Sequence, residues 1–296
     1  MTKTDSLFID PALEKRFREE GYVKVPLLSA IEADKLAELF NRTRAEHEIV
    51  NTLHHTTTDT QNKKVISEVD VAIKKAFAPA LNGLLHNYKP LAGCFHVKQP
   101  GTGSATGTHQ DPTFVDEDNF VSANIWVALH DMNDANGNLY FIPGSNKIPC
   151  LRITPSSPTY YANFAADLVP MSVSVPMKKG EAVIFYNGTI HGATDNVSND
   201  LRLAATLLVC SQPADWLLYY RDSNNKNGEI EKYLLDFDTF VTMPKNGRPN
   251  KAALKELIHY NFPVLTKQEF EKAIKPQRPN RNMLSWVMSI FGKQDV

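Results

Sequence analysis

The sequence predicts a mainly β protein with helical additions, in which short antiparallel strands form a barrel or jelly roll. Residues 91–212 contain several short runs rich in β-branched and aromatic residues, separated by Gly, Pro and Asn. Few helical patterns interrupt these runs, which argues against β-α-β units. The helical patterns lie instead before residue 90 and after residue 212.

The N-terminal region, residues 1–90, is expected to be helical and to pack on the barrel. Ser29 and Glu32 have the spacing of a capping box, which predicts a helix over about residues 30–47. A short strand is expected just before it, at residues 21–26. Apolar residues recur at helical spacing over residues 69–85 and predict a second helix.

The strand-prone runs of the core, residues 91–212, follow in the order LAGCFHVK, VSANIWVALHD, LYFIP, MSVSVPM, EAVIFYNG and LRLAATLLVC. Residues 213–296 are expected to form a helical and loop extension, with a second capping box at Thr266 and Glu269. The apolar stretch 282–291 is a candidate to pack on the barrel or to form a dimer contact, so both a monomer and a homodimer stay open. All 296 residues are expected to form one domain.

Charge and hydropathy exclude several classes of partner. The 32 Lys and Arg residues nearly cancel the 33 Asp and Glu residues, so no global field favours nucleic acid or an anionic membrane. No apolar run approaches the about 20 residues that span a bilayer, and the N-terminus lacks a signal-peptide pattern. The three cysteines are widely spaced and are expected to be buried thiols. We therefore expect a cytoplasmic protein whose partner is a small molecule.

His109 and Asp111 carry the strongest local chemical signal. Residues two positions apart in an extended segment point to the same side and can bind one metal ion together. His191 follows the strand-prone run EAVIFYNG and is the best candidate for a third ligand. Two histidines and one carboxylate on one face of an octahedral ion leave three positions open, which is the ligand set of non-haem iron(II) oxygenases.

Arg202 begins an apolar run, where a buried guanidinium would be costly without an anion. Arginine forms planar, bidentate pairs with carboxylates, so Arg202 suits the distal carboxylate of 2-oxoglutarate. The alternative is that Arg202 lies at the exposed start of the strand and pairs with Asp195 or Asp200.

Several motifs in one order resemble the phytanoyl-CoA dioxygenase family, which includes ectoine hydroxylase-like enzymes. They are KQP at 98–100, THQD at 108–111, WVAL at 126–129, NGNL at 136–139, IPGS at 142–145, GEAV at 180–183 and NVS at 196–198, together with His191 and Arg202. The resemblance implies a double-stranded β-helix (jelly-roll, cupin-like) core. It also implies iron(II) at His109, Asp111 and His191, with the cosubstrate carboxylate at Arg202. Trp126 and Lys98 match positions that line the cosubstrate pocket in relatives.

Two positions depart from the family pattern. Asn146 stands where the family often has a histidine, and we expect this change to be structural. Ala193 stands where the family often has a serine, two positions after the distal histidine. Thr194 or Thr206 is expected to replace the lost hydroxyl beside the cosubstrate.

The resemblance implies a dioxygenase that converts 2-oxoglutarate and O2 to succinate and CO2 while oxidising, most often hydroxylating, a small organic substrate. Desaturation, ring closure and endoperoxide formation remain open, whereas the presence of Asp111 argues against chlorination. One alternative is a zinc hydrolase, because the same three ligands suit zinc. Another is a catalytically silent β-barrel binding protein. Arg202 has no role in the first, and the complete ligand set argues against the second.

Substrate selection is expected outside the motif-bearing strands. The segment 151–170 is interpreted as a partly ordered lid, and Tyr219, Tyr220 and Arg221 as contacts for an anionic substrate. The structural alternative is that these residues only hold the C-terminal region on the barrel. His54 and His55 are expected in a solvated or substrate-gating loop.

Overall fold

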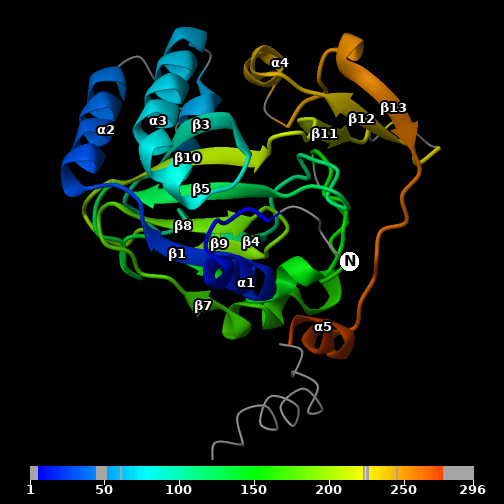
Figure 1. The fold of residues 1–296 in the computed structure, drawn as a ribbon. Helices are drawn as coiled ribbons and strands as arrows, with labels where there is room; N and C mark the ends of the chain where they lie inside the picture. The colour runs from blue at the N-terminus through cyan, green and yellow to red at the C-terminus, as the bar shows by residue number, and fades with distance from the viewer. Residues whose placement is uncertain are drawn as a thin grey trace, which may run out of the picture.

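The computed structural model describes residues 6–44, 52–60, 62–155, 157–222, 224, 227–244 and 246–275. Antiparallel strands form its centre, and the longer helices lie to one side of them (Figure 1). The predicted fold class, mainly β with a double-stranded β-helix core, is confirmed. None of the helices in the described part of the chain combines the length and apolar character that a membrane crossing requires.

A six-stranded sheet forms the larger wall of the core. Its strands, in spatial order, are β1 (Tyr22–Pro26), β8 (Glu181–Tyr186), β5 (Ser122–Ala128), β10 (Arg202–Ser211), β3 (Tyr88–Lys98) and β2 (His54–Thr56). All neighbours are antiparallel. Because side chains alternate between the two faces, every second residue of each strand points into the core of the β-helix.

A four-stranded sheet forms the facing wall. Its order is β4 (Thr106–His109), β9 (His191–Ala193), β6 (Leu139–Phe141) and β7 (Val173–Ser174). An apolar cluster joins the two sheets, with Trp126 and Phe185 from the larger wall against Phe141 and Ala193 from the smaller one. The strands β2, β4 and β9 were not predicted, because they are short and contain mostly His, Thr, Gly and Ala, which give no strand pattern.

Helices cover the outer face of the six-stranded sheet. They are α1 (Pro11–Glu20), α2 (Ala30–Thr43) and α3 (Lys63–Leu84), and α2 and α3 lie side by side above β3 and β10 in Figure 1. Their buried residues share one large apolar cluster with the outward-facing residues of the sheet. The predicted capping box is present at Ser29 and Glu32. Helix α3 begins earlier than expected, α1 was not predicted, and residues 45–47 of the first predicted helix lie outside the described residues.

The region after residue 212 differs from the prediction of helix and loop. The strands β11 (Leu217–Tyr220), β12 (Ile230–Leu234) and β13 (Leu254–Ile258) form a separate antiparallel sheet. Charged residues on its solvent-facing side, including Lys232, Lys255 and Glu256, obscured the strand pattern. Two helices complete the region, α4 (Phe237–Thr242) and α5 (Lys267–Ile274), and α5 has the predicted capping box. The predicted contact at 282–291 lies outside the described residues.

Short 3-10 helices occupy several connections. They are η2 (Thr57–Asp59), η3 (Ser145–Lys147), η4 (Ala162–Asp167), η5 (Val169–Met171) and η6 (Lys251–Ala253). The segment 151–170, predicted as a lid, is instead part of the packed structure. Its residues Tyr160, Phe164 and Leu168 are buried with Phe270 of α5 in an apolar cluster. Aromatic residues of this segment therefore attach the C-terminal helix to the core.

Candidate metal centre and cosubstrate pocket

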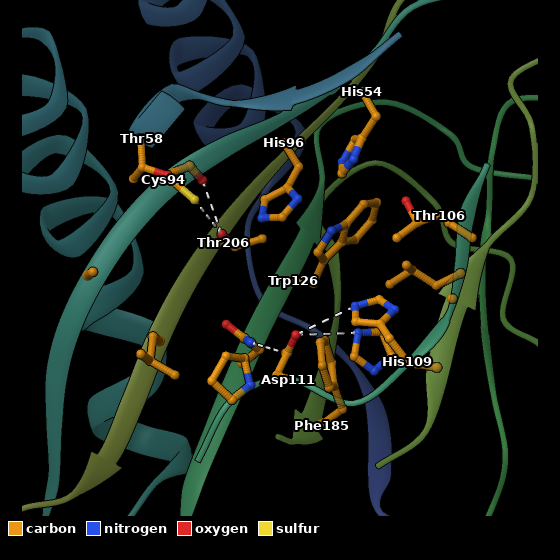
Figure 2. Close-up of a pocket in the computed structure, with 18 of the residues that line it drawn as sticks. His54, Thr58, Cys94, His96, Thr106, His109, Asp111, Trp126, Phe185 and Thr206 are labelled. Atoms are coloured by element: carbon orange, nitrogen blue, oxygen red, sulfur yellow. Dashed lines mark hydrogen bonds and ion pairs between the residues drawn. The ribbon is translucent and has the colours of Figure 1, made fainter. Parts of the chain in front are cut away.

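His109 and His191 come from neighbouring strands of the smaller sheet. They are register partners in the β4–β9 pair, and their ring centroids lie 4.3 Å apart. Asp111 follows β4 by two residues, and its Oδ1 lies 3.7 Å from His109 Nε2 and 3.9 Å from His191 Nε2 (Figure 2). One candidate ligand atom from each residue lies within 4.8 Å of the others. Three donors at this spacing suit a single ion with ligand bonds of about 2.0–2.2 Å.

The backbone fixes both imidazole rings in the orientation that a metal needs. His109 Nδ1 lies 2.8 Å from the Gly107 carbonyl oxygen, and His191 Nδ1 lies 2.9 Å from that of Thr189. A carbonyl oxygen only accepts, so each Nδ1 donates its proton and each Nε2 keeps its lone pair toward Asp111. Burial, and next the neighbouring His109, lower the pKa of His191 to about 4, which keeps this imidazole neutral.

Asp111 is held by three neighbours. Asn124 Nδ2 donates to Asp111 Oδ2 at 2.6 Å, which leaves Oδ1 facing the histidines. The Asp111 backbone N–H donates to the Asn187 carbonyl at 2.9 Å, and its carbonyl accepts from Arg152 Nε at 2.7 Å. Hydrogen bonds of this kind orient a ligating carboxylate and are part of the site.

Arg152 and Glu117 form an ion pair behind the metal centre that the sequence analysis missed. The Arg152 side chain is only 4% exposed and makes two hydrogen bonds to the Glu117 carboxylate. It also donates to the Cys150 carbonyl at 2.8 Å. The available signal was an arginine in an apolar run, the same signal that identified Arg202. Because segment 151–170 was interpreted as a lid, Arg152 was not considered as a buried residue.

Arg202 is a buried cation without an anionic partner among the described residues. It is 1% exposed, and its Nη1 donates to the Gly137 carbonyl at 3.2 Å while its Nε has no hydrogen-bond partner. Its guanidinium lies over the Trp126 ring, 5.1 Å from the centroid. Desolvation alone lowers the pKa of Arg202 to about 9. An unpaired buried cation is costly, so this position fits the carboxylate of a bound molecule.

Lys98 lies beside Arg202 as its register partner on β3. It is fully buried, and its Nζ donates to the Thr194 carbonyl at 2.6 Å. Burial, and next the charge of Arg202, lower the pKa of Lys98 to about 7. Gly137, with φ of +85°, lies against the Lys98 stem, where a Cβ would come within 2.7 Å of Cδ. Lys98 does not line the cavity, but it adds positive potential behind Arg202.

A cavity of about 230 Å³ connects the metal centre with Arg202. Of the residues expected beside the cosubstrate, Trp126 and Thr206 line this cavity, whereas Thr194 does not. Thr206 Oγ1 donates to the Cys94 carbonyl at 3.2 Å and lies opposite His109 and Asp111 in Figure 2. Of the two hydroxyls expected to replace the missing serine, Thr206 is the one that faces the cavity.

The residues predicted to bind substrate do not line this cavity. Tyr219 is 6% exposed and packs in a small apolar cluster, while Tyr220 is a register partner of Glu231 on β12. Arg221 lies over the Phe262 ring, 5.7 Å from its centroid. These contacts match the structural alternative, in which the residues hold the C-terminal region in place.

Two histidines outside the metal centre, His54 and His96, also line the cavity. His54 belongs to strand β2 and not to a solvated loop, because β2 pairs with β3. Its ring centroid lies 5.7 Å from that of His96, and both side chains lie above Trp126 in Figure 2. His55, one residue on, is buried. The alternation along β2 and its pairing with β3 decide that His54, and not His55, faces the cavity. Neither this alternation nor this pairing could be predicted from the sequence.

Comparisons with known proteins identify the family and the fold of the chain. The sequence model of the phytanoyl-CoA dioxygenase family matches residues 17–204. Phytanoyl-CoA dioxygenase 1 of Oryza sativa subsp. japonica is 30% identical over 168 residues, which cover 51% of this chain and 57% of the relative. Phytanoyl-CoA dioxygenase of Arabidopsis thaliana is 34% identical over 122 residues, which cover 38% and 41%. The match thus spans about half the length of these curated relatives.

Solved structures share the fold. The epimerase SnoN, in complex with Fe3+, α-ketoglutarate and nogalamycin RO, is 26% identical with a TM-score of 0.52, and the match covers 70% of this chain and 87% of SnoN. For EctD from S. alaskensis, solved with 2-oxoglutarate and 5-hydroxyectoine, the identity is 17%, the TM-score 0.52 and the coverage 70% and 78%. Because the family model covers more than half of the sequence, the chain belongs to the phytanoyl-CoA dioxygenase family.

Proposed function

We propose that this chain is an iron(II)- and 2-oxoglutarate-dependent dioxygenase that hydroxylates a small organic metabolite and releases succinate and CO2. The observation that carries the proposal is the buried, unpaired guanidinium of Arg202 at one end of a cavity that is also lined by the three metal-ligand side chains. A zinc hydrolase would have no use for such a cation. Family membership and the iron and α-ketoglutarate bound in SnoN support the same proposal.

Each residue has a distinct role in this proposal. His109, Asp111 and His191 hold iron(II) through their inward-facing donor atoms. Arg202 binds the distal carboxylate of 2-oxoglutarate, with Trp126 beside it and Thr206 as an additional hydroxyl. When bound, iron and the cosubstrate supply the oxidising power, with O2 as the oxidant. The protein would supply the ligand positions and the cavity that brings iron and the cosubstrate together.

The choice of hydroxylation rests on what the reaction requires. Relatives include an epimerase and a carbocyclase, so the fold supports several outcomes. Hydroxylation requires only that a C–H bond be held next to the metal, whereas ring closure also requires a second substrate group in place.

We also propose a cytoplasmic location for this chain. The three cysteines are free thiols, which supports this location.

Anaerobic addition of iron(II) and 2-oxoglutarate tests the metal centre. We expect a visible charge-transfer band from the chelated cosubstrate in the wild-type protein. The variant carrying both His109→Ala and Asp111→Ala should not bind iron and should not show the band. A wild-type protein without the band, or a double variant that retains it, contradicts the proposal.

The cosubstrate contact is tested by Arg202→Gln. A charge-assisted hydrogen bond contributes about 1.5–3 kcal/mol, so the Kd for 2-oxoglutarate should rise by about tenfold to more than a hundredfold. Iron affinity should change little, because Arg202 is not a ligand. Arg221→Gln is the matched control, since Arg221 lies away from the cavity. Unchanged cosubstrate affinity in folded Arg202→Gln protein would make Arg202 a structural residue.

A further inference from the structure

The inner face of the six-stranded sheet changes character along its strands. On β10, the inward positions Arg202, Thr206 and Leu208 line the cavity. Their register partners on β3 are Lys98, Cys94 and Ala92. The same face is therefore cationic at one end, polar in the middle and apolar at the other end.

The metal centre lies toward the apolar end of this face. Asn124, which holds the Asp111 carboxylate, is the register partner of Leu208 on β10. Trp126 lies one inward position closer to Arg202 and stacks against its guanidinium. Under the proposed function, a cosubstrate bound between the metal ligands and Arg202 would occupy the space along Trp126. A second molecule would then approach the metal ligands from the opposite end.

That opposite end is lined by apolar side chains. Ala92 and Leu208 form its floor on the sheet, and Phe114, from the loop after β4, and Phe240, from α4, also line it. Phe240 lies beyond residues 17–204, which match the family model. This chain's own C-terminal region therefore contributes one aromatic residue to a cavity that the shared core builds.

The surroundings of α4 direct its two phenylalanines to different places. The Phe240 ring lies 5.1 Å from that of Trp216, and Phe240 lines the cavity. Phe237, one turn earlier, has the Lys74 ammonium 4.9 Å from its ring centroid and does not line the cavity. Two residues of equal size on one short helix thus provide a test and its control.

We propose that the apolar end of the cavity binds an alkyl or aryl part of the substrate and that Phe240 sets the length of that part. The inference rests on the proposed function, because the position of the cosubstrate determines which end stays available. It assigns the substrate class as an organic molecule whose oxidised carbon belongs to an apolar segment. Phe240 is then a specificity-determining residue.

The test measures binding of straight-chain primary alcohols, from 1-propanol to 1-octanol, to the full-length protein by anaerobic calorimetry. Neutral alcohols do not compete for Arg202, and binding is measured with and without iron(II) and 2-oxoglutarate. Each buried methylene contributes about 0.8 kcal/mol, so affinity should rise about fourfold per carbon until the chain meets Phe240. Phe240→Ala should extend this rise to alcohols at least two carbons longer. With Phe240→Trp the rise in affinity should stop at a shorter alcohol, and with Phe237→Ala it should stop at the same length as in the wild type.

The outcomes separate this inference from the proposed function. A protein that binds iron and 2-oxoglutarate but shows no dependence on alcohol length overturns the inference alone. The same holds if Phe237→Ala and both Phe240 variants all behave like wild type. If Phe240→Ala does not fold, Phe240→Leu replaces it with the same direction of effect. Failure to bind iron or 2-oxoglutarate overturns the proposed function instead, while the length dependence without them still reports on the cavity wall.

Discussion

Lys98 and Arg202 are neighbouring buried cations, and their environment explains how a dianion would be recognised. Neither has a carboxylate partner at ion-pair distance in the described part of the chain, and burial lowers the pKa of both. Removing two like charges from water costs free energy, and a bound anion would offset it. In the ligand-free protein Lys98 limits this cost by releasing its proton near neutral pH. A bound dicarboxylate favours the charged form again.

Binding of 2-oxoglutarate is therefore expected to take up a proton. With a pKa of about 7 for Lys98 in the free protein, the cosubstrate binds best below that pH. Its affinity should fall by up to about tenfold per pH unit as the pH rises above 7. Calorimetry in buffers of different ionisation enthalpy measures the proton taken up. Lys98→Met should abolish both effects, and a Lys98→Met protein with wild-type proton uptake would assign the proton to another group.

The pH dependence that Lys98 gives to the stability of the ligand-free protein has the opposite sign: cosubstrate affinity falls as the pH rises, whereas the free energy of unfolding increases. The unfolded chain keeps the lysine proton up to about pH 10.5, whereas the folded protein loses it near pH 7. Unfolded chains thus bind more protons between these values, so the free energy of unfolding rises with pH across this window. Lys98→Met should be more stable than wild type at pH 7, and the difference should shrink toward pH 10 in chemical denaturation.

Some site residues could be predicted from the sequence because their signal is local. His109 and Asp111 are two positions apart, and Arg202 stands in an apolar run. Asn124 gave no such signal, since one amide in the run SANIWVA is equally consistent with the outer face of a strand. Only the pairing of β5 with β10 shows that Asn124 faces Asp111. Glu117 lies in a loop, and its partner Arg152 is 35 residues away.

Among the elements, length and burial decided which could be predicted. The helices α2 and α5 begin with capping boxes, and the long strands β3 and β10 are apolar enough to be recognised. Strand β13 is largely exposed and its residues LKELI suit a helix as well as a strand. Its conformation depends on pairing with β12, a contact between segments that the sequence pattern does not encode.

The loop after β4 is expected to depend on the Glu117–Arg152 pair for the position of Asp111. Glu117→Gln keeps the shape of the side chain but leaves the buried Arg152 cation unpaired, which costs about 3–5 kcal/mol. Because Arg152 also donates to the Asp111 carbonyl, iron affinity should fall by about tenfold to a hundredfold. Denaturant titration and competition with a coloured iron chelator measure the two effects.

A matched control separates the specific effect of the Glu117–Arg152 pair from the effect of losing one negative charge. Asp215 pairs with Lys255 on the surface at 2.6 Å, and both side chains are about half exposed. Asp215→Asn should change the free energy of unfolding by only about 0–1 kcal/mol and leave iron affinity unchanged. If Glu117→Gln loses stability but binds iron normally, the pair supports the fold without positioning Asp111.

At the scale of the whole molecule, the main apolar core and the metal centre occupy opposite faces of the six-stranded sheet. The largest cluster joins the helices α1, α2 and α3 to the outward-facing residues of that sheet, such as Phe95, Ile125 and Leu207. The metal ligands lie on the inner side of that sheet: His109 and His191 are on strands of the smaller sheet, and Asp111 is in the loop after β4. Folding should therefore not require the metal, in contrast to small zinc domains that unfold without it.

Chelation tests this separation. After treatment with EDTA, the far-UV circular dichroism spectrum and a cooperative thermal transition should be preserved. Adding iron(II) and 2-oxoglutarate should then raise the transition midpoint, because ligands that bind only the folded state add about 2.7 kcal/mol at a hundredfold excess over Kd. The variant carrying His109→Ala and Asp111→Ala should melt at the same temperature with or without them, since it has lost two of its three ligands. Loss of the native spectrum on chelation would make the metal a structural element of the fold, and the two faces of the sheet would then not be independent.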